Sequence, residues 1–500
     1  MLTRLKVNGF KNLADADVRF GPFTCIAGAN GAGKSNLFDA IHFLSLTANY
    51  PLLEAALRVR DETGHNADVR SLFRRVGETW GDTISFEAEM IVPPEAIDDL
   101  GQKGEAAITF LRYNLDIRLR KGAESNATSN PLEIIREELK HILLGSAHDH
   151  LLFPHNASLW RKRVLTGKRS GTAFISTTVK EDGSRTIKVH QDAGGGGRAY
   201  ERAAASLPRT VLSSATAAES PTALCVRREM QGWRLLQLEP DALRQPDEFS
   251  SPTHLESSGR HLPANLSRLA TREQAEGVYF QLANRLSELI GSVQALRIDR
   301  DKKRELLTLM MAGPDGTELP ARALSDGTLR FLALSVLELD PESRGLICLE
   351  EPENSIHPDR IPAIIRLLQD IATDPKQEAS ETNPLRQVII NTHSPSVVAA
   401  VPEDSLLLAK LEKDGQNGQK FTKAVFACLP GNWRLEGKPA CPEAEPGEMP
   451  GYLDSAKIAQ YAETHPDRPR RVINHPEFKL ITSMFKGRGD EAPDDTPAKT

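Results

Sequence analysis

Eight consecutive residues govern the interpretation of this chain: Gly28-Ala29-Asn30-Gly31-Ala32-Gly33-Lys34-Ser35. They match the phosphate-binding pattern G-x-x-x-x-G-K-[ST]. An apolar, strand-like run precedes them at residues 24–27, and apolar residues follow at helical spacing, at Leu37, Ile41 and Leu44. The pattern is specific in this order of strand, loop and helix, which disfavours the alternative of a glycine-rich turn that happens to carry a lysine.

A phosphate-binding loop needs these residue types for physical reasons. The glycines let the backbone curl so that successive N–H groups point at phosphate oxygens, and the helix N-terminus adds a favourable dipole. The Lys34 ammonium would neutralise the β- and γ-phosphates of ATP, and the Ser35 hydroxyl would hold Mg²⁺. The residues expected to bind ATP are Gly28, Asn30, Gly31, Ala32, Gly33, Lys34, Ser35 and Asn36.

Two carboxylates end a second apolar strand, because residues 345–349 lead directly into Glu350 and Glu351. The carboxyl end of a buried parallel strand is where a doubly wound fold places a ligand site. We expect Glu350 to support Mg²⁺, directly or through water, and Glu351 to orient and polarise the attacking water. Alone, an acidic cluster is more often a solvated turn, and the phosphate-binding loop reverses that preference.

Two other segments fit the same chemistry. Residues 387–391 form a third apolar strand, and His393 follows it where it would hydrogen-bond the γ-phosphate or the attacking water. Residues 324–330 open a helical run in which Ser325 as N-cap and Gly327 near the start leave N–H groups exposed, a second anion cradle. In isolation these would be a structural histidine and an ordinary helix cap, so the interpretation depends on the whole set.

The order of these motifs resembles a known family. The opening GFKNL, the segment FGPFTCIAGANGAGKSNLFDAI, then LSDGTLR, LICLEEPENSIHP and IINTHSP are similar to the ABC-type ATPase heads of SMC, RecF and OLD-like proteins. They resemble most closely the predicted ATPases of the AAA_21 group, and the motifs cover residues 1–50 and 320–410. The resemblance implies an α/β fold: a mixed or parallel P-loop sheet with helices, and an antiparallel β lobe.

In such heads LSDGTLR corresponds to the ABC signature. The resemblance implies that Ser325 and Gly327 bind, in trans, the ATP held by a second protomer, so that ATP joins a homodimer. It places Asn354, Ser355 and His357 in the loop at the dimer interface and gives His393 the role of switch histidine.

The sequence departs from the family pattern at three points. Glu350 stands where the family most often has Asp, and no glutamine can be assigned as the second metal ligand. Asp326 replaces the first glycine of a transporter-type signature, a difference shared with SMC-like heads.

Strand and helix patterns divide the chain. Alternating runs between residues 68 and 119 predict a β lobe, and Asp182-Gly183 predicts a hairpin over residues 174–189. Residues 132–296 otherwise carry helical patterns, without a heptad repeat that would form a long coiled coil. We expect four segments: residues 1–125, the first part of the head with the P-loop and β lobe; 126–300, a mixed α/β insertion; 301–430, the second part with signature, acidic strand end and switch histidine; and 431–500, an extension with a disordered end.

Composition and residue patterns disfavour several classes of protein. The chain of 500 residues has a net charge of −6, no apolar leader and no membrane-spanning run, which predicts a cytoplasmic protein without a membrane role. Its cysteines, without C-x-x-C spacing, are expected as reduced, mostly buried thiols. The His148-Asp149-His150 run is assigned no metal, and Gly-rich residues 194–197 are expected as a flexible loop.

These observations favour an ATP-driven switch that acts on DNA, in repair or anti-phage defence, with an effector such as a nuclease supplied in trans. DNA contact would need local basic stretches, at residues 161–163, 168–169 and 468–471. Two alternatives remain. An OLD-like nuclease would need clustered carboxylates after His393, where no D-x-D occurs, and the nucleotide-binding subunit of a transporter is disfavoured by the long insertion and by Asp326.

Overall fold

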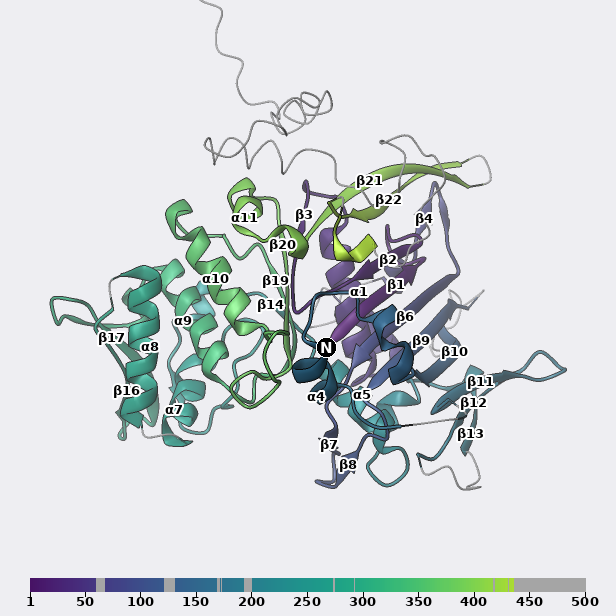
Figure 1. Cartoon of the computed structure of the whole chain (residues 1–500), viewed down its shortest axis with the longest axis horizontal. Coiled ribbons are helices and arrows are strands. Elements are labelled where there is room, and N and C mark those ends of the chain that lie inside the picture. Colours follow the sequence, from purple (N-terminus) through teal and green to yellow (C-terminus); the bar gives the residue numbers. More distant parts are fainter. Residues whose placement is uncertain are drawn as a thin grey trace, which may run out of the picture.

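The computed structural model describes residues 1–59, 68–120, 131–168, 171, 173–192, 200–272, 275–291, 293–416, 419–429 and 431–435. Several features predicted from the sequence lie outside these residues: the glycine-rich loop at 194–197, Arg169, Cys441, the basic run at 468–471 and the C-terminal tail. The described part has a helical lobe on the left of Figure 1 and a large antiparallel sheet on the right.

A six-stranded sheet lies between the two lobes (Figure 1), in the order β14 (Arg234–Leu236), β19 (Gly345–Glu350), β20 (Arg386–Thr392), β3 (Phe23–Ala27), β21 (Leu406–Gln416) and β22 (Gln419–Ala427). The first five strands are parallel, and β22 returns antiparallel to β21. Their apolar runs suit a sheet that is buried on both faces. Because the strands are parallel, β3, β19 and β20 deliver their carboxyl ends to one edge.

The two faces of this sheet enter different cores. Ile26 and Ile389 belong to the core shared with the β lobe and with α1 (Lys34–Thr47). Their neighbours Cys25 and Ile390 belong to the core of the helical lobe. Successive side chains along each strand therefore point to opposite faces, and the sheet packs against one lobe on each face.

The β lobe is antiparallel, as predicted, and the structure gives its sheet eight strands. Its order is β13 (Tyr200–Ala203), β12 (Arg185–Val189), β11 (Ile175–Val179), β10 (Leu132–His141), β9 (Phe110–Leu119), β6 (Thr83–Ile91), β1 (Leu2–Asn8) and β2 (Ala16–Arg19). The hairpin predicted at Asp182-Gly183 is confirmed by β11 and β12, and the Ser184 amide donates to the Asp182 side chain.

One expectation within this lobe is wrong. Residues 132–141, which lie in the region predicted to carry helical patterns, form strand β10, paired with β9 along its length. A β-bulge between Ile134 and Arg136 shifts the register, and the polar Glu137 points inward. Both features break the period-two alternation by which strands are recognised. The boundary expected near residue 125 therefore lies between two paired strands.

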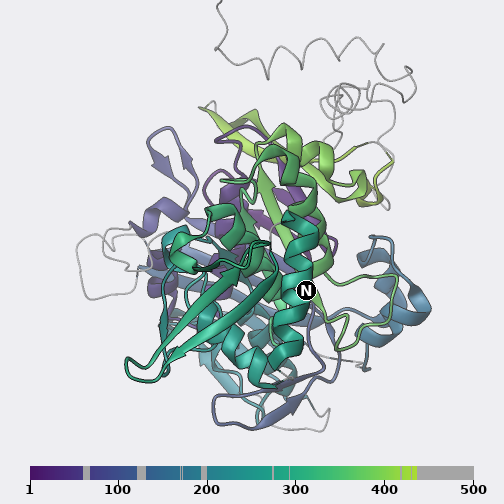
Figure 2. The same cartoon turned by 90° about the vertical axis from the view of Figure 1, so that its left-hand side faces the viewer.

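The helical lobe carries the segment that resembles the ABC signature. Its helices are α6 (Pro240–Leu243), α7 (Leu262–Arg272), α8 (Ala275–Ile290), α9 (Asp326–Leu339), α10 (Ile361–Ile371) and α11 (Pro395–Ala400). A small sheet of β15 (Asp247–Glu248), β16 (Ala295–Asp301), β17 (Leu306–Ala312) and β18 (Glu318–Pro320) accompanies them (Figure 2). No described helix exceeds the 16 residues of α8, so this part of the chain contains no long coiled coil.

Shorter elements complete the described chain. They are α2 (Leu52–Arg58), α3 (Ala147–His150), α4 (Lys162–Val164), α5 (Pro221–Gln231) and the hairpins β4 (Arg75–Val76) with β5 (Thr79–Trp80) and β7 (Glu95–Ile97) with β8 (Lys103–Glu105). Single turns cover Val69–Leu72, Leu144–Ser146, Ala157–Arg161, Ala204–Ser206, Leu212–Ser214, Ala321–Ala323, Pro358–Arg360, Glu403–Ser405 and Trp433–Leu435. Among the described residues, no helix has both the length and the apolar character that crossing a membrane would require.

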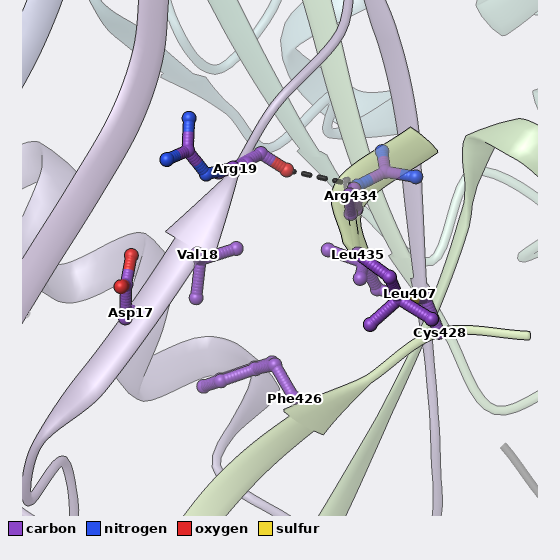
Figure 3. A pocket seen from close by; sticks show the side chains of 8 residues that line it. All are labelled: Asp17, Val18, Arg19, Leu407, Phe426, Cys428, Arg434 and Leu435. Carbon is purple, nitrogen blue, oxygen red and sulfur yellow. Dashed lines mark hydrogen bonds between the residues drawn. The ribbon is translucent and has the colours of Figure 1, made fainter. Parts of the chain in front are cut away.

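The last described turn is fixed by a buried arginine. Arg434 lies against β2 and β21, where Figure 3 shows its guanidinium directed at the Arg19 carbonyl, 2.9 Å from Nε. Burial lowers the pKa of Arg434 to about 9. A cavity of only about 20 Å³ remains beside it, too small for a ligand larger than water. Cys428 nearby is buried, like the other three described cysteines, Cys25, Cys225 and Cys348.

Candidate nucleotide-binding site

The phosphate-binding loop follows β3 and packs on the β21–β22 hairpin, and two of its glycines leave no room for a side chain. A Cβ on Gly28 would lie 2.4 Å from the carbonyl oxygen of Ala409, and one on Gly33 would lie 2.5 Å from the Ala424 Cβ. Gly33 also has a φ of 95°, a conformation that side-chain-bearing residues avoid. Gly31, at φ 79°, has open space around it, so the tip of the loop is free to meet a ligand.

The first turn of α1 has the features of an anion-binding site. Its N-cap is Gly33, which offers no side-chain acceptor, and no acidic residue lies in the first turn. The N–H groups that begin a helix have no partner within it, and the helix dipole favours negative charge there. A phosphate group fits both requirements.

The side chain of Lys34 folds back onto the phosphate-binding loop. Its Nζ donates to the carbonyl oxygens of Gly28 at 2.7 Å and Ala29 at 3.0 Å. Burial lowers the pKa of Lys34, against the opposing charges of Glu351, Glu350 and Glu353. The predicted lysine and the predicted acidic strand end are therefore brought within electrostatic range of each other.

The segment GFKNL supports the start of α1. The Asn36 side chain donates from Nδ2 to Oδ1 of Asn12 at 2.7 Å, and the Asn12 carbonyl accepts from the Ala424 amide. Lys11 forms an ion pair with Asp39 at 2.5 Å, one turn further along α1. Through these contacts, the loop preceding β2 connects the first helix to the β21–β22 hairpin.

Asn391, the last residue but one of β20, organises the acidic strand end. Its Nδ2 donates to Glu350 at 3.1 Å, and its side-chain and backbone oxygens accept from the Glu351 amide at 3.2 and 3.0 Å. Sequence reasoning assigned Asn391 no role. The available signal was a buried amide at the end of an otherwise apolar strand, next to a strand that ends in two carboxylates.

The Glu351 carboxylate is held from two sides. His393 Nδ1 lies 2.7 Å from one carboxylate oxygen, and Asn354 Nδ2 donates to the other at 3.0 Å. Burial alone would raise the pKa of Glu351, but the hydrogen bonds from Asn354 and His393, with the charges of His393 and Lys34, lower it. Glu351 and His393, both expected to be catalytic, thus meet directly, and the lowered pKa favours an ionised Glu351.

The segment that resembles the signature begins α9. Ser325 is the N-cap and accepts from the Thr328 amide at 3.2 Å, and Asp326 pairs with Arg244. A Cβ on Gly327 would lie 3.1 Å from the Ser355 carbonyl oxygen. In the described chain no hydrogen bond or ion pair joins Ser325 or Gly327 to residues 28–36, and α9 and α1 lie on opposite sides of the central sheet (Figure 1).

The residues expected to hold Mg²⁺ are oxygen donors, Ser35 at the start of α1 and Glu350 at the end of β19. Mg²⁺ in nucleotide sites usually binds one or two side chains together with phosphate oxygens and water. The described residues contain no cluster of three or more acidic, histidine or cysteine ligands, and such a site does not require one. His150 of the histidine-rich run is instead bound to Glu89, at 3.0 Å.

A phosphate-binding loop and paired glutamates at the carboxyl edge of a parallel sheet, with an antiparallel β lobe beside them, are the arrangement of an ABC-type P-loop head. Residues 1–69 match the family described as RecF/RecN/SMC N terminal domain, and residues 180–399 match the family described as AAA domain, putative AbiEii toxin, Type IV TA system. Over these two segments the chain is similar to the SMC/RecF-like P-loop ATPases.

The similar proteins include RecF proteins and an SMC head, which are also named in the family description matched by residues 1–69. The DNA replication and repair protein RecF of Chromohalobacter salexigens is 30% identical over 146 residues, 29% of this chain and 35% of the relative. RecF of Magnetococcus marinus is 43% identical over 112 residues, 21% of this chain and 24% of the relative. The matches thus span about a third or less of these relatives. The solved structure of an SMC head bound to the C-winged helix domain of ScpA has 14% identity and a TM-score of 0.42, covering 86% of this chain and 98% of that one.

Proposed function

We propose that this protein binds ATP with Mg²⁺, hydrolyses ATP to ADP and phosphate, and works in the cytoplasm as an ATP-gated homodimer. One observation carries the proposal: Lys34 lies within electrostatic range of Glu350, Glu351 and Glu353, and Glu351 is held by Asn354 and His393. Cation, metal ligand and ionised base thus gather at one edge of the sheet.

Each residue has a separate task in hydrolysis. The first turn of α1 and the Lys34 ammonium bind and orient the phosphates. Ser35 and Glu350 would hold Mg²⁺, which neutralises charge that develops on the phosphate oxygens. The Glu351 carboxylate accepts a hydrogen bond from the attacking water and orients it toward the γ-phosphorus. His393, on the other side of Glu351, keeps the carboxylate in place and responds to the γ-phosphate.

The position of the second anion cradle, Ser325 and Gly327, supports the proposed dimer. Ser325 is exposed at the start of α9, in the lobe that lies across the sheet from α1 (Figure 1). An ATP molecule bound at Lys34 would therefore meet Ser325 and Gly327 of a second protomer more readily than those of its own. Loss of the γ-phosphate would remove contacts from both protomers at once, which lets hydrolysis drive separation.

DNA is the proposed partner in the biological role, in repair or in anti-phage defence with a separate effector. Support comes from the relatives named DNA replication and repair protein RecF and from the family described as putative AbiEii toxin. In the predicted basic stretch at 161–163, Arg163 is 67% exposed, and Glu378 lies 3.8 Å away. The division into four segments and a nuclease supplied in trans remain parts of this proposal.

ATP turnover of the wild type and of Lys34→Ala tests the proposed activity. The wild type is expected to bind and hydrolyse ATP, and removal of the ammonium is expected to weaken ATP binding by at least about tenfold. Lys410→Ala is the matched control, because Lys410 is a partly exposed lysine of β21 that pairs with Glu412. A wild type that does not bind ATP, or a Lys34→Ala variant that matches Lys410→Ala, would refute the proposal.

A further inference from the structure

Arg330 is a half-buried cation with an unused donor. It lies on α9, one turn after Asp326, and its Nε is buried without a hydrogen-bond partner among the described residues. Burial lowers the pKa of Arg330, while the charges of Asp326 and Glu353 oppose this. A buried guanidinium donor without an acceptor is costly, so such groups are expected to find a partner in the working state.

Glu353 is the complementary group, on the loop after β19 that carries Glu351, Glu353 and Asn354 and is called the hydrolysis loop below. One carboxylate oxygen accepts from the Thr392 hydroxyl, and the other, Oε2, is buried without a partner among the described residues. Burial raises the pKa of Glu353. Thr392 immediately precedes His393, and Glu353 follows Glu351 by two residues, so Glu353 is joined to both members of the hydrolytic pair.

The backbone places these two groups on facing surfaces. Gly327 packs on the backbone of residue 355, where only 3.1 Å separates a Cβ built on Gly327 from the Ser355 carbonyl oxygen. Arg330 is three residues after Gly327, which puts both on the same side of α9. A movement of α9 would therefore displace the loop that carries Glu351, Glu353 and Asn354, because Gly327 packs on its backbone.

We propose that Arg330 and Glu353 are positioning residues, a pair that couples the start of α9 to the geometry of Glu351 and His393. The inference rests on the proposed ATP hydrolysis and adds a mechanism that controls when hydrolysis occurs. When Ser325 and Gly327 bind the γ-phosphate held by a second protomer, α9 presses on the hydrolysis loop and the Arg330 Nε–H donates to the free oxygen of Glu353. The pair then fixes the loop with Glu351 directed at the attacking water, so hydrolysis waits for dimerisation.

A double-mutant cycle tests the pair. Arg330→Gln, Glu353→Gln and the double variant are compared with the wild type for kcat, KM for ATP, ATP affinity and Tm. Each single variant is expected to lower kcat about tenfold, with KM and ATP affinity changed less than about threefold. The double variant is expected to lower kcat no further than either single one, because both disable one interaction. Arg366→Gln, on an exposed arginine of α10, is the control and is expected to retain wild-type kcat.

Two outcomes overturn the pair: a wild-type kcat in both single variants, or losses that multiply in the double variant. Arg330→Lys guards against a folding defect, since a lysine restores the charge but not the Nε donor and is expected to recover only part of kcat. A failure of the proposed function looks different, because the wild type itself would then show no ATP turnover.

Discussion

Glu351 has a backbone conformation that few residues of its type adopt. Its φ is 45°, in the left-handed region that costs a non-glycine residue about 1 kcal/mol. The amide of Glu351 is fixed by Asn391, and its carboxylate is fixed by Asn354 and His393. These bonds offset the strain and turn the carboxylate toward the edge of the sheet where Lys34 lies.

The pH dependence of turnover should report on this environment. Because hydrogen bonds from Asn354 and His393 lower the pKa of Glu351, removing either one should raise that pKa. Glu351 would then become protonated at a higher pH, and the acid limb of the kcat profile would move upward. We expect this shift in Asn354→Ala and His393→Ala but not in His148→Ala, an exposed histidine of α3. An acid limb that stays in place in both variants would mean that another group controls it.

Local patterns could predict the principal site residues. Gly28 to Ser35 match the phosphate-binding pattern between a strand and a helix, and Glu350, Glu351 and His393 each follow an apolar run. Asn391 and Arg330 could not be assigned in this way, because their roles depend on neighbours that are distant along the chain. Asn391 acts through strand pairing with Glu350, and Arg330 acts through packing of α9 on residue 355.

At the scale of elements, strands were predictable where alternation was intact. The strands at 83–91 and 110–119 have regular alternation and a covered apolar face, and both were expected. Strand β10 was not, since its bulge and the inward-pointing Glu137 remove the pattern. Glu137 is acceptable inside because the amides of Val211 and Leu212 both donate to its carboxylate at 2.8 Å, contacts that no local pattern reveals.

A second buried carboxylate on the β lobe predicts an acid limit to stability. Glu89 of β6 is fully buried, and burial would raise its pKa, but His150 and Arg112 lower it to about 2. A depressed pKa in the folded state stabilises the protein above the ordinary value of the group, and this stabilisation is lost as pH falls from about 4.5 toward 2.

Glu89→Gln should therefore flatten the acid dependence of stability. We expect a loss of about 3 kcal/mol at pH 7 and a smaller further loss on acidification than in the wild type. Urea unfolding at a series of pH values measures both quantities. Glu87→Gln is the control, because Glu87 lies on the same strand and face, 24% exposed beside Lys6. If the free energy of unfolding fell equally steeply with acid in the wild type and in Glu89→Gln, Glu89 would not be the cause of the acid dependence.

At the scale of the whole molecule, the two groups of residues that we propose to bind nucleotide lie apart. The central sheet places Lys34, Glu350, Glu351 and His393 at one edge, while Ser325 and Gly327 begin a helix of the other lobe (Figures 1 and 2). The long insertion between the first and second parts of the head made this separation impossible to derive from local patterns. Only the order of motifs and the resemblance to known heads pointed to it. Assembly of two chains is the central claim of the account.

The mass and ATP turnover of Glu351→Gln, with and without double-stranded DNA, test this claim most directly. Glutamine keeps the shape of the side chain but removes the base, so the variant should bind ATP, lose turnover by at least about a hundredfold and accumulate as a dimer. Stimulation of wild-type turnover by DNA would support the role proposed in genome maintenance. A variant that stays monomeric with ATP and hydrolyses it at the wild-type rate would contradict both the catalytic assignment and the ATP-gated dimer.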